Sequence, residues 1–528
     1  MCDGNPRNKG SITWGHTYAK GLDNVGHRIF WAAVAQKNFI VRGCDASNAF
    51  AEAPPPKHPL YVRIDTPFRE WWAGKNRPAI PAGYVFPVQK ALQGHPESPR
   101  LWATLIDIIL TQELELKPTT HEPCLYHGVF NGEEILFLRQ VDDFLCGAKT
   151  NETAEQFIAL LNTKMTIDVK DLGIIYRYNG VDIHQTKNFI KLHCGTYIKK
   201  ILNENEWFQE GQKPTTRYPI PMRNESDFQE QMELAQPPTD QEGCFNLEKK
   251  MGFKYRRAIG ELLYTMVTCR PDISFPVIKL SQYSTHPAEE HYLAVKQLYI
   301  YLRDTFDDGI YFWRSTPCDF LPYSSDPLPK PDLPQPTLTK DEASKMTGYV
   351  DATWANDSSH RRSVSGFTLM LSGGCIYYKT SFQTTIALSS TESEFAAACE
   401  AGKAILFVRS ILEEISLPQD AATILSIDNK GALLMANAQQ PTRRTRHVEM
   451  KHFALLDWVE RDLLTLVSVR SSANIADALT KALGRILHYR HFDKIMGRIN
   501  LKYAIGTQPG DSDLAMNKCR EGSADITS

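Results

Sequence analysis

The alternation of apolar and polar residues predicts a mixture of strands and helices in the first half of the chain. Residues 58–64 ("HPLYVRI") and 133–141 ("EEILFLRQV") form the short apolar runs that are typical of strands. Residues 98–114 ("SPRLWATLIDIILTQEL") predict a helix with a proline in its first turn. Residues 255–284 and 288–306 also have helical patterns.

The last block continues the alternation of strands and helices. After the run "TGYVDATWAND", strands are predicted at residues 365–372, 375–381, 422–428 and 464–470, and helices at residues 390–415, 451–463 and 474–483. Thr391 and Glu394 have the T-x-x-E spacing of a capping box at the start of helix 390–415. Strands that alternate with helices indicate α/β or α+β domains.

Two polar, proline-containing stretches interrupt the periodic segments. Residues 213–243 and 316–337 are predicted to be linkers or long surface loops. At roughly 100–200 residues per domain, a chain of 528 residues is expected to hold about three or four domains.

Composition narrows the class of protein. The net charge is −2 and the pI is near 6.7, so bulk charge does not favour a nucleic-acid binder, although residues 360–362 and 442–447 are locally basic. The eleven cysteines include no C-x-x-C pair, which favours reduced thiols in an intracellular protein. No apolar run is long enough to predict a membrane span, and the N-terminus "MCDGNPRNKG" lacks the apolar core of a signal peptide.

Two adjacent aspartates lie within an apolar run. Asp142 and Asp143 are flanked by residues 135–138 and 144–146, and a buried charge is costly unless it is paired or bound to metal. A hairpin with two carboxylates at its tip, joined by Asp45 at the end of another apolar strand, suits two Mg²⁺ ions about 3.5–4 Å apart. Such ions activate a 3′-hydroxyl and neutralise the leaving pyrophosphate. The alternative is that Asp-Asp is only a turn signal.

Four acids in the last block each lie at the edge of a predicted element. They are Asp351 after a strand, Glu392 at the start of the capped helix, Asp428 after a strand and Asp477 in the last helix. Strand ends and helix starts can converge at one edge of a sheet, where a carboxylate cluster repels itself unless metal ions neutralise it. Two Mg²⁺ ions there would activate water against a phosphodiester. Each acid alone also fits a helix start or a turn.

The strings around these acids resemble the Pol polyprotein of copia-type (Pseudoviridae) LTR retrotransposons, in which a reverse transcriptase precedes an RNase H. The strings "RGCDASNAFAEA", "KALQGHPESPRLW" and "FLRQVDDFLCGA" are similar to motifs of the polymerase palm, and "GYVDATWAND", "SSTESEF", "SIDNKGAL" and "ANIADALTKAL" are similar to the RNase H. The resemblance is collinear through nearly the whole chain. It implies a multidomain α/β and α+β fold, with a right-hand palm and thumb followed by an RNase H-like mixed five-stranded sheet with flanking helices.

The resemblance also implies a domain organisation in five parts. They are truncated reverse transcriptase fingers and palm (1–175), a thumb-like segment and linker (176–250), a helical connection that ends in the proline-rich linker (251–345), RNase H (346–484) and a C-terminal tail (485–528). The family has a basic finger hairpin upstream, and only Arg7 and Lys9 remain near that place. We therefore expect the chain to be a fragment of a polyprotein without its upstream protease and integrase.

For the polymerase, the resemblance aligns Asp45, Asp142 and Asp143 with the metal-binding catalytic triad. The implied substrate-binding residues are Phe50 as the gate against a ribose 2′-hydroxyl, Gln93 and Gly94 in the nucleotide pocket, and Lys170 at the nucleotide or pyrophosphate. Without the family context, Phe50 would be a core aromatic and Lys170 a surface lysine. The residue before the turn departs from the family, since Gln140 stands where the family usually has Tyr.

For the RNase H, the resemblance makes Asp351, Glu392, Asp428 and Asp477 the metal-binding catalytic acids. Three arginines suit phosphate groups of the substrate, and one histidine resembles a family residue that helps product release; these are Arg443, Arg444, Arg446 and His447. Selection of RNA would come from contacts to 2′-hydroxyls. A zinc set of His447, Glu449 and His452 is not expected, because the spacing fits no standard zinc motif.

These observations predict an RNA-directed DNA polymerase with a tethered ribonuclease H that serves retrotransposon replication. Each active site would hold two Mg²⁺ or Mn²⁺ ions, and the partners would be an RNA template, a DNA primer, the RNA–DNA hybrid and dNTPs, with no membrane. The expected location is the cytoplasm, in virus-like particles, or the nucleus; oligomeric state does not follow from the sequence. The alternatives are an active RNase H beside a polymerase impaired by the missing fingers, and an inactive nucleic-acid-binding remnant.

Overall fold

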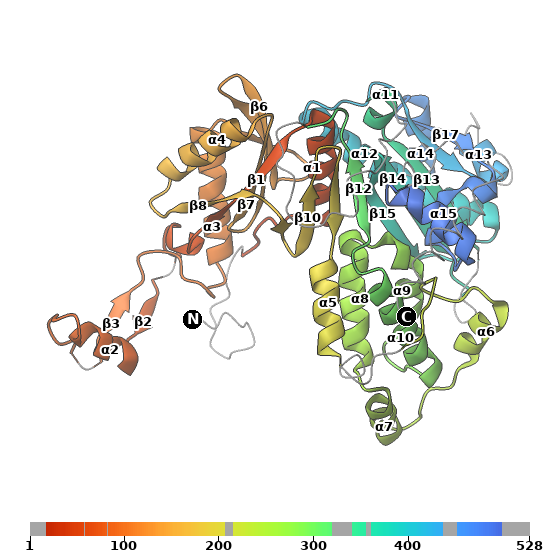
Figure 1. Ribbon diagram of the computed structural model, residues 1–528, viewed down its shortest axis with the longest axis horizontal. Helices are drawn as coiled ribbons and strands as arrows, with labels where there is room; N and C mark the ends of the chain where they lie inside the picture. The colour runs from red at the N-terminus through yellow and green to blue at the C-terminus, as the bar shows by residue number, and fades with distance from the viewer. Residues whose placement is uncertain are drawn as a thin grey trace, which may run out of the picture. The chain divides into compact units, whose positions relative to one another are not determined.

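The computed structural model describes residues 17–57, 59–81, 83–205, 215–318, 340–354, 361–436 and 451–498. The chain divides into two compact units, which are considered separately below (Figure 1). The first unit comprises residues up to 30, 39–179 and 414–416, and the second comprises 31–38, 180–413 and the residues from 417 onward. Helix α1 (Asn24–Lys37) begins in the first unit and ends in the second.

A six-stranded antiparallel sheet forms the centre of the first unit. Its strand order is β4-β5-β6-β7-β1-β8. The strands are β1 (Ile40–Ala46), β4 (Lys117–Pro118), β5 (Leu125–Phe130), β6 (Glu133–Gln140), β7 (Asp143–Ala148) and β8 (Val169–Ile174), and the short β9 (Arg177–Tyr178) follows. Helices α3 (Ser98–Ile108) and α4 (Asn151–Thr163) supply apolar side chains to the same core as this sheet.

Alternating residues of the strands build the core of the first unit. Phe137 on β6 and Phe144 on β7 are buried, and their ring centroids lie 5.5 Å apart. Trp102 of α3 is also buried and lies 6.4 Å from Phe144, while Phe157 of α4 lies 5.8 Å from Phe137. Large aromatic rings contribute much of the burial that holds helices on a sheet. The strand ends of β1, β6 and β7 are therefore held on a rigid base.

A small lobe extends from the first unit between β1 and α3. It consists of β2 (Tyr61–Arg63), α2 (Thr66–Ala73) and β3 (Val85–Pro87), with β2 and β3 paired antiparallel. Phe68, Trp72 and Phe86 pack between the helix and the strands. Asp65 caps α2, because its side chain accepts a hydrogen bond of 2.9 Å from the Phe68 N–H.

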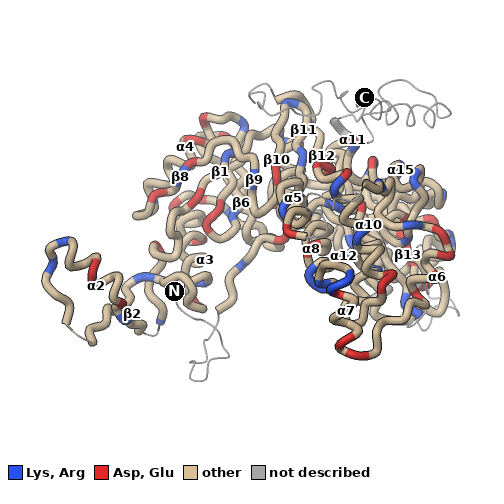
Figure 2. The backbone as a smooth tube through the Cα atoms, turned by 60° about the horizontal axis from the view of Figure 1, so that its bottom comes forward, with Lys and Arg blue, Asp and Glu red and all other residues tan. Residues whose placement is uncertain are grey.

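The second unit begins with an antiparallel sheet and a group of helices. Strands β10 (Val181–Gln185), β11 (Phe189–His193) and β12 (Gly309–Trp313) pair in that order. The helices are α5 (Gly195–Glu204), α6 (Ser226–Leu234), α7 (Gln241–Met251), α8 (Tyr255–Cys269), α9 (Ser274–Ser281) and α10 (Glu289–Asp304). Figure 2 shows acidic and basic residues along the whole tube, with a basic stretch where α7 leads into α8.

A buried ion pair lies between α8 and α9. The guanidinium of Arg270 donates to Asp272 at 2.8 and 2.7 Å, and both side chains are fully buried. Tyr301 of α10 donates to the same carboxylate at 2.8 Å, and Arg270 also donates to Thr305. The two charges are thus satisfied by one another and by neutral partners, as buried charges must be.

A mixed five-stranded sheet forms the rest of the second unit, and it confirms the sheet that the sequence predicts. The order is β15-β14-β13-β16-β17, in which β13, β16 and β17 run parallel, and β14 is antiparallel to both of its neighbours, β13 and β15. The strands are β13 (Thr347–Thr353), β14 (Val364–Leu371), β15 (Gly374–Phe382), β16 (Thr423–Ile427) and β17 (Leu464–Ser468). The helices are α11 (Lys340–Ser344), α12 (Ser390–Glu414), α13 (Lys430–Ala436), α14 (Lys451–Glu460) and α15 (Arg485–Ile495).

Helix α12 covers this sheet and packs on α14. Its buried residues follow the whole length of the helix, and Gly402 allows the close approach, because a Cβ there would lie 2.6 Å from the ring of Trp458. None of the helices within the described ranges has both the length and the apolar character that crossing a membrane requires.

The structure corrects two predictions about elements. Residues 213–243 are not a continuous linker, because α6 and the start of α7 lie within them; Met232 of α6 is fully buried and its carbonyl bonds to His291. Residues 474–483 do not form an α-helix but a short 3₁₀ helix, Ile475–Leu479. The side chain of Asn474 donates to the Val350 carbonyl and accepts from the Ala476 N–H, which fixes this segment against β13.

Two further predicted segments are only partly described. Most of the proline-rich stretch 316–337 lies outside the described residues. The stretch predicted as a C-terminal tail begins with helix α15, whose residues Tyr489, Phe492 and Ile495 are buried. The five predicted domain boundaries themselves stay predictions.

Two candidate active sites

The polymerase-like acids lie at the ends of two paired strands in the first unit. Asp45 on β1 is the direct partner of Asp143 on β7 in the antiparallel register. Asp142 occupies the turn between β6 and β7, and its carbonyl accepts a 3.0 Å hydrogen bond from the Ala46 N–H. The pairing of the strands therefore brings Asp45 to two adjacent acids that lie almost a hundred residues later in the sequence.

The turn that carries the two aspartates is held in an uncommon backbone conformation. Val141, between Gln140 and Asp142, has a φ of +58°, which is unfavourable for a β-branched residue. The indole N–H of Trp102 donates a 2.6 Å hydrogen bond to the Val141 carbonyl. Gln140, at the position where Tyr was expected, accepts a hydrogen bond from the Leu22 N–H at 2.9 Å. These contacts fix the tip of the hairpin.

The charges of the three acids act on one another. The pKa of Asp143 is raised above its ordinary value by burial and then by the nearby charges of Asp142 and Asp45. Carboxylates in this arrangement are stabilised in their ionised form when a cation lies between them. The site is suited to divalent metal, as predicted, although the metal-binding role of each residue stays a prediction.

The remaining predicted polymerase residues differ in exposure, and one of them, Lys170, lies beside the acids. Lys170 on β8 is the direct strand partner of Asp45 and is exposed. Phe50, in the 3₁₀ turn Ala49–Ala51, is half-buried and packs on the core of the first unit. Gln93 and Gly94 are exposed, and Gly94 has a φ of +87°, which favours glycine. Their substrate contacts stay predictions.

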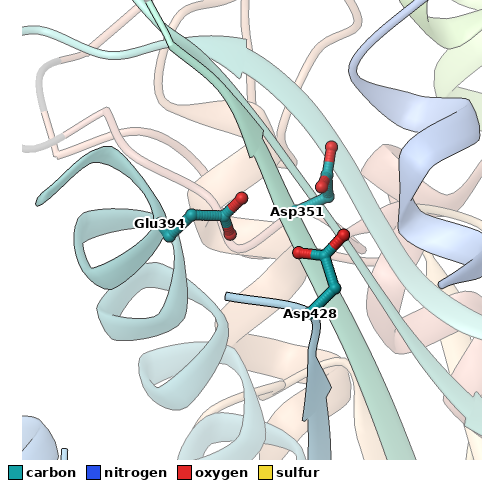
Figure 3. Close-up of side chains that lie close together, drawn as sticks. All are labelled: Asp351, Glu394 and Asp428. Atoms are coloured by element: carbon teal, nitrogen blue, oxygen red, sulfur yellow. The ribbon is translucent and has the colours of Figure 1, made fainter. Parts of the chain in front are cut away.

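A tighter cluster of carboxylates lies in the second unit. One oxygen atom from each of Asp351, Glu394 and Asp428 can be chosen so that all three lie within 4.8 Å of one another (Figure 3). Asp351 belongs to β13 and Asp428 follows the end of β16. These strands are parallel, and Tyr349 pairs with Ser426, so the two aspartates lie at the same level of the sheet. Glu394 comes from the start of α12, which lies on the sheet.

The structure corrects the predicted glutamate of this cluster from Glu392 to Glu394. The N–H of Glu392 donates to Ser389 Oγ at 3.2 Å, and its carboxylate accepts from the Leu388 N–H at 2.8 Å. Glu392 therefore caps the first turn of α12, where its charge is favourable. Two residues along a helix correspond to a rotation of about 200°, so Glu394 faces the sheet while Glu392 does not.

The predicted capping box was displaced by two residues, and this caused the error. Ser389 and Glu392 occupy the positions that we assigned to Thr391 and Glu394. The sequence also contains the spacing S-x-x-E from Ser389 to Glu392. A capping box at these two residues leaves the side chain of Glu394 available for the cluster. Glu394 is the functional candidate that sequence reasoning missed.

Burial and mutual repulsion raise the pKa values of two acids in the cluster. The pKa of Asp351 is raised to about 7, by burial first and then by the charge of Asp477. The pKa of Glu394 is raised to about 9, by burial and then by Asp351 and Asp428. Glu394 Oε2 is buried and has no hydrogen-bond partner. A buried oxygen without a partner, next to other carboxylates, fits a divalent cation with oxygen ligands.

Asp477 lies close enough to this cluster for its charge to act on two of the acids, and its metal-binding role stays a prediction. It is buried in the 3₁₀ helix after β17, and its charge contributes to the raised pKa values of Asp351 and Glu394. Its Oδ1 has no hydrogen-bond partner, while Oδ2 lies 3.0 Å from the Lys481 ammonium. Thr480 Oγ1 donates to the carboxylate of Asp351. The 3₁₀ helix thus brings a fourth acid and a compensating lysine to the same edge of the sheet.

The predicted basic residues of the second site lie outside the described residues. They are Arg443, Arg444, Arg446 and His447. The side chains of Glu449 and His452 likewise lie outside them. Their predicted roles stay predictions.

Known proteins resemble this chain over most of its length. Residues 16–218 match the family described as "Reverse transcriptase (RNA-dependent DNA polymerase)". The retrovirus-related Pol polyprotein from transposon TNT 1-94 of Nicotiana tabacum is 29% identical over 406 residues, which are 76% of this chain and 27% of that protein. The corresponding polyprotein from transposon RE1 of Arabidopsis thaliana is 24% identical over 486 residues, which are 92% of this chain and 29% of that protein. The chain thus spans less than a third of these relatives.

Solved structures show only a distant likeness. A ribonuclease H1 isolated from compost, LC11-RNase H1, is 14% identical with a TM-score of 0.22 and covers 26% of this chain and 92% of its own. The prototype foamy virus protease-reverse transcriptase is 10% identical with a TM-score of 0.21 and covers 89% of this chain and 48% of its own. Scores this low carry no argument about either site.

Proposed function

Because the chain belongs to the Pol polyproteins of copia-type retrotransposons, we propose that it is an RNA-directed DNA polymerase with a tethered ribonuclease H. The first unit would extend a DNA primer on an RNA template with dNTPs. The mixed-sheet part of the second unit would cleave the RNA strand of the resulting hybrid. The whole would serve retrotransposon replication, within virus-like particles in the cytoplasm.

The observation that carries this proposal is the acidic cluster of Asp351, Glu394 and Asp428. Three carboxylates whose oxygens lie within 4.8 Å repel one another strongly, and two of them have raised pKa values. Without a cation, the repulsion between these carboxylates destabilises the folded chain, so the cluster does not serve stability. A divalent cation removes the repulsion, which supports a metal-dependent hydrolase.

At the second site, Asp351, Glu394, Asp428 and Asp477 would hold Mg²⁺ or Mn²⁺. Two such ions, when bound, would supply an activated water and stabilise the charge that develops on the phosphodiester. The protein's own contribution is to fix the four acids from separate elements before substrate binds. Lys481 beside Asp477 limits the negative charge at the outer side of the cluster.

At the first site, Asp45, Asp142 and Asp143 would hold the same type of ion. Trp102 would keep the hairpin tip in place through its bond to the Val141 carbonyl, so that the carboxylates do not move during nucleotide addition. Lys170, the strand partner of Asp45, would contact the triphosphate of the incoming nucleotide. Phe50, Gln93 and Gly94 would line the path of its sugar and base.

One observation favours a second candidate function, in which the RNase H works and polymerisation does not. Within the described ranges, the cluster of the second unit alone brings three such ligand atoms within 4.8 Å of one another. The polymerase-like acids are paired on neighbouring strands but are less closely gathered.

Two assays on the full chain test the proposal. Primer extension with dNTPs reports on the first site, and cleavage of an RNA–DNA hybrid reports on the second, each with Mg²⁺ and with EDTA. Asp143→Asn should abolish extension alone, and Asp428→Asn should abolish cleavage alone, with both variants folded by circular dichroism. If the unmodified chain cleaves the hybrid but does not extend the primer, the second candidate function is supported. If the unmodified chain has neither activity, the proposal is contradicted.

A further inference from the structure

A cavity of about 590 Å³ lies among the helices of the second unit. The residues that line it come from α6, from α10 and from residues 218–223, which precede α6. None of these lining residues belongs to either candidate active site. Cavities of roughly 300–1,000 Å³ have the size that takes up one small molecule. The cavity is therefore a candidate binding site that the proposed function does not use.

Hydrogen bonds fix the walls of the cavity relative to one another. The side-chain amide of Gln297 on α10 donates to the Ile220 carbonyl at 3.2 Å, which holds the segment before α6 against α10. The ring of His291 on α10 bonds to the Met232 carbonyl of α6 at 2.8 Å. Each wall is thus tied to α10. A cavity with fixed walls binds a ligand without first paying the entropy of ordering them.

Much of the lining is apolar or aromatic. Helix α10 contributes Leu293 and Ile300, which are seven residues apart and so lie on one face of the helix. Phe228 of α6 and Tyr218 contribute two rings. Leu293 is 52% exposed, so a ligand in the cavity would remove apolar surface from water. The lining therefore suits the apolar or aromatic body of a ligand.

Two cations line the same cavity from different segments. Lys296 on α10 is half-buried, and burial lowers the pKa of its ammonium group. The guanidinium carbon of Arg223 lies 5.5 Å from the centroid of the Phe228 ring. An anionic group in the cavity would stabilise both charges. The exposed acid Glu290 also lines the cavity and would repel a ligand with many negative charges, such as a nucleic-acid strand.

We propose that this cavity binds a small amphipathic anion, that is, an apolar or aromatic body that carries a single anionic group. The body would lie against Leu293, Ile300 and the aromatic rings. The anionic group would bond to Lys296 and Arg223, because an ammonium and a guanidinium both donate charge-assisted hydrogen bonds to oxyanions. The inference does not depend on the polymerase or the ribonuclease H activity, because the residues of the cavity are separate from both sites.

A fluorescent probe tests this proposal on the full chain. Anilinonaphthalene sulfonate has an aromatic body and one anionic group, and N-phenyl-naphthylamine has the same rings without the sulfonate. The test variants are Lys296→Met and Leu293→Asn. Their matched controls are Lys249→Met, at an exposed lysine of α7, and Leu434→Asn, at a leucine of α13 that is 71% exposed. Thermal unfolding of all four variants checks that they are folded.

The unmodified chain should bind the sulfonate about tenfold more tightly than the neutral probe. Lys296→Met should weaken binding of the sulfonate about fivefold and leave binding of the neutral probe unchanged. Leu293→Asn should weaken binding of both probes by about fivefold, because it removes apolar contact. The two controls should match the unmodified chain. Equal affinity of the unmodified chain for the two probes, or undiminished binding of the sulfonate by Lys296→Met, would overturn the proposal.

Competition against the bound sulfonate identifies the anionic group that the cavity prefers. The competitors are naphthoate, naphthyl phosphate and naphthol, which share one ring system and present a carboxylate, a phosphate or a neutral hydroxyl. Displacement by naphthoate or by naphthyl phosphate at concentrations where naphthol has no effect would support the proposal and name the group. Displacement by all three to the same extent, or by none of them, would overturn it.

Discussion

Glu392 and Glu394 lie two residues apart on α12, and only Glu394 belongs to the acidic cluster. Glu392 caps the helix through the Leu388 N–H, so the two carboxylates point in different directions and have different tasks. The rotation of the helix alone thus separates an acid that caps the helix from an acid that joins the cluster.

Substitution of these two glutamates should give opposite results. Glu394→Gln is expected to lower hybrid cleavage by about a hundredfold or more, because it removes a charged ligand from the site. Glu392→Gln should change cleavage by about twofold or less and cost about 0.3–1 kcal/mol of stability, because glutamine can still accept from the Leu388 N–H and only the favourable charge at the helix N-terminus is lost. Steady-state cleavage and thermal unfolding of both variants measure this. A severe loss in Glu392→Gln with an active Glu394→Gln would restore the original assignment.

The raised pKa values predict a pH dependence of stability without metal. Asp351 and Glu394 have ordinary values of 3.8 and 4.5 and values of about 7 and about 9 in the folded chain. At pH values between the ordinary and the raised pKa of each acid, the folded state binds more protons than the unfolded state. The free energy of unfolding should therefore fall as pH rises from about 5 to about 9. Thermal unfolding in EDTA across this range measures the fall.

Divalent metal should reverse this dependence. Mg²⁺ or Mn²⁺ binds the ionised acids, so the unfolding temperature should rise with added metal, and the rise should be larger at pH 8 than at pH 5. The Asp428→Asn variant, which lacks one ligand, is the control and should respond less. An equal response at both pH values would contradict a link between the metal and these acids.

Trp102→Phe should impair the first site selectively. The substitution keeps the buried ring and removes the N–H that binds the Val141 carbonyl. One such bond contributes about 1 kcal/mol, so primer extension should fall about fivefold while hybrid cleavage is unchanged. Trp71→Phe in the small lobe, where Trp71 is half exposed, is the control. Equal losses of both activities would indicate general destabilisation instead.

Asp272→Asn should be among the most destabilising single substitutions in the second unit. It leaves the buried charge of Arg270 without its partner, which costs about 3–5 kcal/mol. Asp457→Asn removes one partner of an exposed ion pair, Arg461–Asp457, and should have little effect. Urea denaturation of the two variants compares them. A small effect of Asp272→Asn would mean that Arg270 finds other partners in the folded chain.

Much of both sites follows from local sequence. Asp142 and Asp143 are predicted at the tip of a hairpin and Asp45 at the end of another apolar strand, and strand pairing brings Asp45 opposite Asp143. Asp351 and Asp428 are predicted to lie close together because each lies at the end of a strand, and the structure pairs these two strands in parallel. The alternation of strands and helices predicts α/β or α+β domains, and the family resemblance adds the mixed five-stranded sheet.

The rest depends on tertiary contacts that a single sequence does not contain. The identity of the capping pair at α12 decides which glutamate faces the sheet, and two overlapping pairs fit the same pattern. The segment after Asn474 has the composition of a helix, but the bond from Asn474 to Val350 fixes it as a short 3₁₀ helix. Residues 226–234 look like a linker because they are polar, while their one deeply buried residue, Met232, holds the helix in place.

The positive φ of Val141 has a consequence for how the chain can evolve. A valine in this conformation costs roughly 1–3 kcal/mol relative to a residue that accepts it freely. Glycine at position 141 would relieve that cost, yet it would also give the aspartate pair more freedom of movement, which the proposed polymerase site would not tolerate. If that proposal holds, selection for a longer-lived fold and selection for a fixed pair of carboxylates pull this one position in opposite directions.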